Sequence, residues 1–241
     1  MIKFFRKIRQ NLLMENKTGK YLKYAIGEIV LVVIGILIAL QINNWNEEKK
    51  ISNTELEILK LMRKNLDSDL SDMNGNIAFY KVRQKAAQVV LKSLDDSLYR
   101  NDSLRFSYAN LGLSPFFTET TSAYENLKSI GFEIIKNDSL KEYIMSIYSK
   151  SYQWMEELED AHSNYTNTIM GPILTDNLIV DNQWQSAKPM NLVELKNNHR
   201  FKETLKKSYG WNYYMIERNK ELMKSVALLV QQITDEIDQR Q

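Results

Sequence analysis

The sequence predicts an all-α protein, with a single N-terminal transmembrane helix followed by an extramembrane antiparallel helical bundle. Three observations favour this fold class. An apolar run lies near the N-terminus, apolar residues beyond it recur at intervals of three and four, and the 241 residues include only 3 prolines and 8 glycines. The three-and-four spacing places apolar side chains on one face of a helix. Strand-rich folds with many tight turns usually need more proline and glycine.

Residues 1–23 are predicted to form a basic amphipathic segment on the cytoplasmic side of the membrane. Basic residues outnumber acids heavily here, because Glu15 is the only acid among residues 1–23. The apolar residues of the segment fall on one helical face, which suits a helix lying against the inner leaflet; they are Ile2, Phe5, Ile8 and Leu12. A frayed tail that only supplies positive charge fits the same residues equally well.

Residues 24–45 are predicted to form the transmembrane helix. The run from Ile29 to Leu40 has no polar side chain, but it covers only ~18 Å of a hydrocarbon core that is about 30 Å thick. The helix must therefore extend at both ends. Tyr24 and Trp45 mark its limits, because aromatic side chains favour the two interfacial layers, and these two lie about 32 Å apart along a helix.

The extended span brings Glu28 into the membrane. A central acid costs about 3 kcal/mol on the insertion scale, whereas the Leu, Ile and Val residues between Ala25 and Ile42 contribute roughly 4 to 7 kcal/mol. Insertion therefore remains favourable. A cleaved signal peptide is the main alternative, but the basic region is long and no small-x-small cleavage site surrounds Ala39.

The excess of basic residues before the span predicts its orientation, since Lys and Arg near a span stay in the cytoplasm. We therefore expect a single-pass protein of the bacterial inner membrane, with a cytoplasmic N-terminus. Residues 46–241 would form a helical bundle in the periplasm. This larger part is mildly acidic, which gives no support to nucleic-acid binding.

The apolar stripe beyond Trp45 predicts one long helix that runs to about Leu98. Asn74-Gly75-Asn76 is the place where a break or kink is expected. A loop of about twenty residues should follow. The next helix should begin where Ser122 and Glu125 form a capping-box pattern, and end near Gly131.

The following helix should begin at Asn137-Asp138-Ser139, whose side chains can accept the free amide protons of a first turn. Gly171-Pro172 is expected to end it, with an irregular stretch from there to Pro189. Asn191 and Glu194 repeat the capping pattern. Two further helices are predicted, at about 192–209 and 211–238, and together these elements form an antiparallel bundle.

Two blocks of this sequence resemble a known group of proteins. They are Tyr24-Ala-Ile-Gly-Glu28 continuing through Gly35-Ile-Leu-Ile-Ala-Leu-Gln41 to Trp45-Asn-Glu47, and Ala123-Tyr-Glu-Asn-Leu-Lys-Ser-Ile-Gly131. The resemblance is to an uncharacterised bacterial family of short single-span membrane proteins, a domain of unknown function. It implies the topology given above and transfers no activity.

The span carries one candidate site, a membrane-helix association face formed by Glu28, Gly35 and Ala39. These residues lie at i, i+7 and i+11, hence on one face, and a pair of small residues four apart lets helices approach closely in lipid. We expect a homo-oligomer or a partner membrane protein against this face. The alternative is a smooth span with an incidental glycine. Glu28 could also carry protons in a proton-coupled envelope complex, or pair with Lys20 or Lys23.

A second candidate is the Glu-x-x-His pattern formed by Glu159 and His162, which di-iron helical bundles use twice. The second half is missing, because Lys196 takes the place of the acid before His199. A metal-dependent helical-bundle enzyme is therefore the least favoured hypothesis. We expect His162 to be a surface histidine, and we assign no metal or cofactor.

The triplet Asp-Ser-Leu occurs three times and resembles a short O-glycosylation signal of some bacterial periplasms. It would direct modification to Ser97, Ser103 or Ser139. Helix capping explains Asp138 equally well.

Cysteine is absent, and so are phosphate-binding loops and nucleophile elbows. The sequence therefore assigns no catalytic residue. The favoured function is a membrane-anchored, non-catalytic helical binding or scaffold module of the bacterial envelope, with the lipid bilayer and an unidentified protein as partners.

Overall fold

The computed structural model describes residues 18–95, 103–112 and 114–240, and two compact units divide the chain at Thr54 and Glu55. The described residues are mostly helical, which confirms the predicted all-α class. The basic segment before Thr18 lies outside them. Helix α2 (Thr18–Asp95) contains a stretch long and apolar enough to cross a membrane. Its most apolar window of 18 residues has a mean hydropathy of 2.6, and none of that window is buried.

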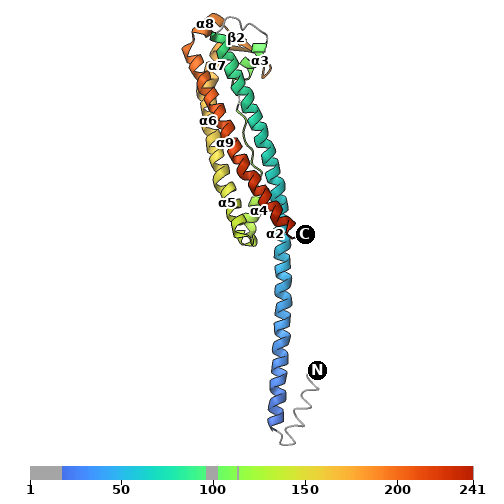
Figure 1. Ribbon diagram of the computed structural model, residues 1–241. Helices are drawn as coiled ribbons and strands as arrows, with labels where there is room; N and C mark the ends of the chain where they lie inside the picture. The colour runs from blue at the N-terminus through green and yellow to red at the C-terminus, as the bar shows by residue number, and fades with distance from the viewer. Residues whose placement is uncertain (1–17, 96–102, 113, 241) are drawn as a thin grey trace. The chain divides into compact units, whose positions relative to one another are not determined.

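Three long helical stretches make up most of the described part of the second unit (Figure 1). They are α2 from Glu55 onward, the run from α5 (Asp138–Ser146) to α7 (Gly171–Asn177), and α9 (His199–Asp238). Ion pairs fix the direction of α9. Arg240, just past the end of α9, binds Glu55, and Lys202 near its start binds Asp95. Helix α9 is therefore antiparallel to α2, as the sequence predicted. We call the end with Asp95 and His199 the far end of the bundle.

The middle helical run continues from α5 through π-helical η2 (Ile147–Tyr152), α6 (Gln153–Tyr165) and π-helical η3 (Thr166–Met170) into α7. The prediction that Gly171-Pro172 ends the helix is wrong. Pro172 lies in the first turn of α7, directly after the widened π-helical turn. A proline there loses no α-helical hydrogen bond of its own segment, so the chain continues as a helix.

The predicted loop after α2 contains a short helix, α3 (Ser103–Ala109), followed by an extended leg that we define as residues 114–121. This leg leads to α4 (Ser122–Ile130) and runs antiparallel to α2. Side chains of α2 contact it in reverse order: Arg83 binds Ser114, Tyr80 binds Pro115, Asp69 binds Thr120, and Asn65 binds Ser122. The chain therefore returns along α2 as an extended segment and not as a helix.

The predicted start of α4 at Ser122 is confirmed, but its capping box is wrong. Thr121 is the N-cap residue and makes no side-chain cap bond. The Ser122 hydroxyl instead accepts a hydrogen bond from Asn65 Nδ2 at 2.9 Å. Gly131, with φ of 111°, ends α4 before the 3₁₀ turn η1 (Phe132–Ile134), because glycine tolerates this conformation at no steric cost.

The two predicted asparagine caps are confirmed. Asn137 accepts from the amide of Leu140, and Asn191 accepts from the amides of Val193 and Glu194 at the start of α8 (Leu192–Asn197). Asp138 does not cap α5, because its carboxylate pairs with Lys141 at 2.8 Å.

The predicted long helix is confirmed, whereas the predicted boundary at Gly210 is wrong. α2 is unbroken through Asn74-Gly75-Asn76. Gly210 does not separate two helices either, because α9 runs through it. The boundary between α8 and α9 lies at Asn198. Its side chain accepts a hydrogen bond from the amide of Phe201 and so caps the start of α9. A single glycine costs a helix only about 1 kcal/mol, which burial of the apolar face on both sides offsets.

The stretch predicted to be irregular up to Pro189 contains an antiparallel hairpin. Strand β1 (Leu178–Asn182) pairs with β2 (Ser186–Pro189), with Ile179 opposite Lys188 and Val180 opposite Ala187. The hairpin lies at the far end of the bundle, next to α3, α7 and α8 (Figure 1).

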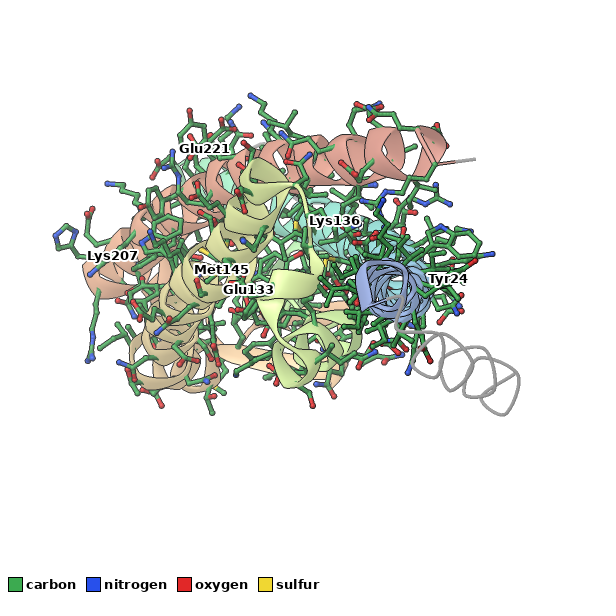
Figure 2. The ribbon with its side chains drawn as sticks, turned by 90° about the horizontal axis from the view of Figure 1, so that it is seen from below. Tyr24, Glu133, Lys136, Met145, Lys207 and Glu221 are labelled. Atoms are coloured by element: carbon green, nitrogen blue, oxygen red, sulfur yellow. The ribbon has the colours of Figure 1, made fainter. Side chains whose placement is uncertain are left out.

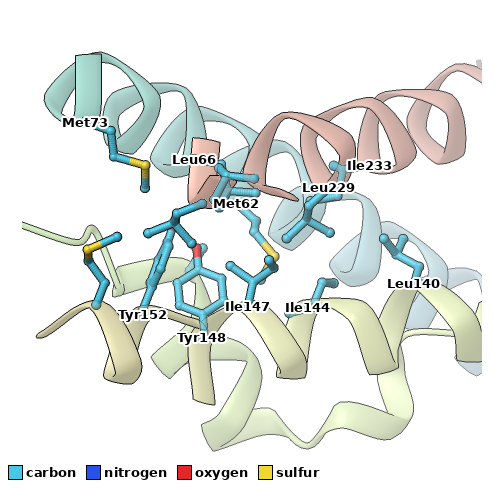
Figure 3. Close-up of a cluster of buried hydrophobic side chains, with 14 of the residues drawn as sticks. Met62, Leu66, Met73, Leu140, Ile144, Ile147, Tyr148, Tyr152, Leu229 and Ile233 are labelled. Atoms are coloured by element: carbon cyan, nitrogen blue, oxygen red, sulfur yellow. The ribbon is translucent and has the colours of Figure 1, made fainter. Parts of the chain in front are cut away.

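The core forms where the apolar stripes of the three long stretches meet. Figure 3 shows Met62 and Leu66 of α2, Ile144 and Ile147 of the middle run, and Leu229 of α9 pointing toward one another. All five are buried, which confirms the predicted stripes. A second apolar cluster at the far end includes the buried side chains of Val90, Leu111, Ile173, Leu178 and Phe201. The outer face of α9 carries charged side chains, among them Lys207 and Glu221, which point into solvent (Figure 2).

Candidate binding site

The structure places all three residues of the predicted association face on helix α2. Glu28 is half-buried, Gly35 and Ala39 are exposed, and a Cβ added at Gly35 would meet open space. Tyr24 and Trp45, the predicted interfacial anchors, are 55% and 60% exposed. The association of this face with another helix stays a prediction.

The prediction that His162 is a surface histidine is wrong, because only 1% of it is exposed. Its ring lies between Tyr80 and Trp211, with ring centroids 5.6 and 5.4 Å away. Nδ1 is 3.4 Å from the Ser114 hydroxyl. Burial and the positive charge of Arg83 lower the pKa of His162 to about 4, so the ring is neutral near pH 7.

Glu159, the other half of the predicted pattern, is also buried and binds the extended leg. Its Oε2 accepts from the amide of Phe117 at 2.9 Å. Burial raises the pKa of Glu159 to about 7; the Phe117 amide opposes the shift, and Asp72 and other nearby acids add to it. No group of three His, Cys, Asp or Glu side chains able to hold a metal occurs in the part of the chain that the structure describes.

Arg83 is the largest fully buried side chain among the described residues. Its guanidinium donates to the carbonyl of Leu111 at 3.0 Å and to the hydroxyl of Ser114 at 3.1 Å. Burial lowers its pKa to about 10, so it stays charged near pH 7. The Ser114 hydroxyl also lies 3.2 Å from that of Thr166, which ties the leg to the middle helical run.

Two aspartates of α2 hold the lower part of the extended leg. Asp69 accepts from the amide of Thr120 at 2.8 Å and from the Tyr152 hydroxyl at 2.8 Å, and Asp72 accepts from the amide of Thr118 at 3.1 Å. The buried polar groups of this region therefore satisfy the backbone of a segment that has no helical or sheet partner of its own.

The candidate binding site is a cavity of about 370 Å³ at the far end of the bundle. Its walls come from the end of α3, from α7, from β1 and from the turn that follows β1. The lining side chains are largely apolar and include Tyr108, Ala109, Leu174, Leu178, Val180 and Trp184. A mostly apolar cavity of this volume falls within the range of ligand-binding pockets, about 300 to 1,000 Å³.

Gly112 allows two of the cavity walls to approach closely. A Cβ added at Gly112 would lie 2.7 Å from Cδ1 of Leu174, so alanine there would push this leucine from its place. Gly171 lines the same cavity, and a Cβ there would lie 3.3 Å from the carbonyl oxygen of Thr166.

Trp184 at the rim has an uncommon backbone conformation. Its φ is 68°, and it is the only residue other than glycine with positive φ within the described chain. A bulky side chain in the left-handed region costs about 1–2 kcal/mol. The Trp184 carbonyl accepts from Asn110 Nδ2 at 2.8 Å, which fixes the turn against α3. The turn thus holds an indole that is 52% exposed beside the cavity.

Further large apolar side chains are exposed on the elements around the cavity. They are Phe106 of α3 and Ile179 and Val180 of β1, each between 42% and 60% exposed. Scattered exposed apolar residues are normal, but a group of them beside an apolar cavity is typical of an interaction surface.

Sequence reasoning did not find this site. The run Leu178-Ile-Val180 is short, and a short apolar run carries little information without knowledge of what lies beside it. The signal that could have been used is Asn182-Gln-Trp184-Gln, where a tryptophan occupies a polar turn between two strand-like segments.

Two of the three predicted modification sites lie within the described residues. Ser139 is exposed in the first turn of α5, Ser103 is the first residue of α3, and Ser97 lies outside the described residues.

A model of a protein family described as a family of unknown function (DUF6090) matches residues 28–178. The matched range takes in the buried polar groups, the extended leg and the α3 and α7 walls of the cavity. Trp184 and β2 follow it in the sequence. No curated protein and no solved structure matches the chain.

Proposed function

The chain belongs to a family of unknown function (DUF6090), and we propose from its own residues that it is a membrane-anchored, non-catalytic binding module. In this function the apolar stretch of α2 holds the protein in a bilayer, and the cavity at the far end of the bundle receives a partner. The titratable groups that sequence patterns suggested for chemistry serve the extended leg instead. His162 and Glu159 both contact it, as does Arg83, for which the sequence suggested no role.

The exposure of the apolar stretch supports anchoring. Ile29, Leu31 and Leu37 are each about 60% exposed, and large aliphatic side chains around a whole helix favour a lipid environment. Basic residues before the stretch support a cytoplasmic N-terminus. The binding module would then face the periplasm of a bacterial cell.

The observation that carries the binding function is the rim tryptophan. A glycine or asparagine would satisfy the turn conformation at 184 with less strain. A strained residue is retained only where the surrounding structure holds it, and such residues cluster at binding and catalytic sites. The indole is exposed and borders an apolar cavity, which favours contact with a partner rather than a role in the core.

Photo-crosslinking in living cells tests the binding function. A photoreactive amino acid at Gln183, which lines the cavity, should give a discrete cross-linked product. The same amino acid at Tyr213, exposed on α9, is the matched control and should not give it. Adding Trp184→Gly should remove the product from the Gln183 protein while leaving the turn folded, because glycine adopts positive φ freely. Identical products from both positions would contradict the proposal.

A reporter fusion tests the orientation. Alkaline phosphatase, which is active only after export, should be active when fused after Gln241 and inactive when fused before the span. Activity would move to the N-terminal fusion if the orientation were reversed. A soluble, shortened mature protein would instead show that the apolar stretch is a cleaved signal.

A further inference from the structure

We propose that the outer edge of β1 binds an extended segment of a partner polypeptide as a third strand, with one bulky apolar side chain of that segment in the adjoining cavity. This inference rests on the proposed binding function and names the class of partner. Its support comes from the hydrogen-bond pattern of the hairpin, from the side of β1 that the cavity occupies, and from the way in which the other edge is covered.

The hydrogen-bond pattern leaves backbone groups of β1 without a strand partner. The Met190 amide donates to the Asn177 carbonyl at 2.9 Å, just outside the paired strands and in the same register. Opposite residues in an antiparallel pair alternate between bonded and non-bonded positions. Ile179 and Lys188 are therefore a bonded pair, and Val180 directs its N–H and C=O away from β2. Among the described residues β1 pairs only with β2.

Pro189 of β2 supports this assignment of bonded and non-bonded pairs. Pro189 faces Leu178, a non-bonded position by the same alternation, and this is where a strand tolerates a residue without an N–H. Helix α3 packs mainly along β2 rather than β1, and it is joined to the turn through the Asn110 side chain and the Trp184 carbonyl. The edge of β1 is the one left for a further strand.

The cavity lies on the side of β1 where an added strand would place a side chain. Leu178 and Val180 are two residues apart, so they point to the same face of the hairpin, and both line the cavity. A residue beside Val180 on an added strand would point the same way. It would enter a space walled by Leu174 and Trp184, which fits a Phe or Leu better than a polar side chain.

Chemistry favours a polypeptide over other apolar ligands. An added strand satisfies the outward N–H and C=O of Val180, which a lipid chain or a small hydrocarbon cannot do. Strand addition of this kind draws affinity from main-chain hydrogen bonds and specificity from pockets for alternate side chains. A two-stranded sheet is also only marginally stable, and a third strand would strengthen it.

The experiment uses the full chain in mild detergent, labelled uniformly with a nitrogen isotope, and a synthetic peptide, acetyl-Lys-Thr-Val-Phe-Val-Thr-Lys-amide. Peptide binding and the hydrogen exchange of the Val180 amide are followed by nuclear magnetic resonance. The peptide should bind and slow this exchange about tenfold or more. Serine in place of its phenylalanine should weaken binding about tenfold.

Val180→Pro removes the outward N–H while leaving the bonds between β1 and β2 in place, and should weaken peptide binding about tenfold or more. Val180→Thr, which keeps the amide and the branched shape, is the matched control and should bind as the natural protein does. Retained Asn110 and Ala187 signals would show that the hairpin of Val180→Pro is folded.

Three results would overturn the inference: equal binding to Val180→Pro, bound peptide without protection of the Val180 amide, or no binding at millimolar peptide. A free protein that is dimeric and already protected at Val180 would also overturn it, because a second copy would then occupy the edge. If Gln183 still cross-links in Val180→Pro cells, the strand inference fails while the binding function stands.

Discussion

Replacing Arg83 by alanine is expected to lower the free energy of unfolding of the bundle by about 4 kcal/mol. The change empties the space of the largest fully buried side chain among the described residues. It also leaves the carbonyl of Leu111 and the hydroxyl of Ser114 without the guanidinium that binds them. Cavities of this kind cost about 2–5 kcal/mol, and a buried polar group without its partner costs about 1–3 kcal/mol. Chemical denaturation in mild detergent, followed by circular dichroism, measures the loss.

Arg83→Met is the matched control for this prediction. Methionine fills much of the same volume and removes a buried charge for which the described residues supply no carboxylate partner. Removal of the desolvation cost should offset part of the lost hydrogen bonding, so a loss of only about 1–2 kcal/mol is expected. Equal losses for Arg83→Ala and Arg83→Met would show that the hydrogen bonds to the extended leg, and not the packing, dominate.

The second large effect is a pH dependence in which two buried groups oppose each other. Glu159 has its pKa raised from 4.5 to about 7. Its contribution to stability is therefore fully present below pH 4.5 and is lost as the pH rises through about 7. His162 has its pKa lowered from 6.5 to about 4. Its contribution is present above pH 6.5 and is lost as the pH falls through about 4.

Removing one of the two groups should reveal how the other makes the free energy of unfolding depend on pH. Relative to the natural protein, Glu159→Gln should gain about 2–3 kcal/mol of stability between pH 4.5 and pH 7, because each pKa unit corresponds to about 1.4 kcal/mol. The side-chain amide oxygen of this variant can still accept from the Phe117 amide, so the leg should stay bound. His162→Gln should change in the opposite sense, losing about 2–3 kcal/mol relative to the natural protein over the same range.

Unfolding free energies measured at several pH values between 4 and 8 check both slopes. The comparison uses differences from the natural protein, since other buried acids such as Asp69, whose pKa burial also raises, contribute to each absolute curve. Parallel curves for the two variants would contradict the prediction. They would mean that neither group changes its pKa on folding.

Arg83, Glu159 and His162 all contact the extended leg. A helix satisfies its own backbone, but an extended segment inside a bundle cannot do so. Side chains of α2 and α6 take over this task, and Asp69, Asp72 and Glu159 each accept from one of its amides. The leg thus explains why charged side chains occur at buried positions of otherwise apolar helix faces.

Local patterns in the chain were enough to establish the helical class, the apolar stretch of α2 and the faces that form the core. Periodicity is a local property, and Leu66, Ile144 and Leu229 carry it without reference to the rest of the chain. The asparagine caps at 137 and 191 were equally readable, because a cap acts on amides two or three residues away.

The burial of His162, the path of the leg and the cavity beside Trp184 became visible only in the folded chain. Each depends on residues distant in sequence: His162 contacts Ser114, the Thr120 amide meets Asp69, and the cavity joins α3 to the turn after β1. Local signals at Gly171-Pro172 and Gly210 predicted breaks that do not occur. Pro172 lies in the first turn of α7, where a proline loses no α-helical hydrogen bond. At Gly210, packing on both sides contributes more free energy than one flexible residue costs, so α9 continues.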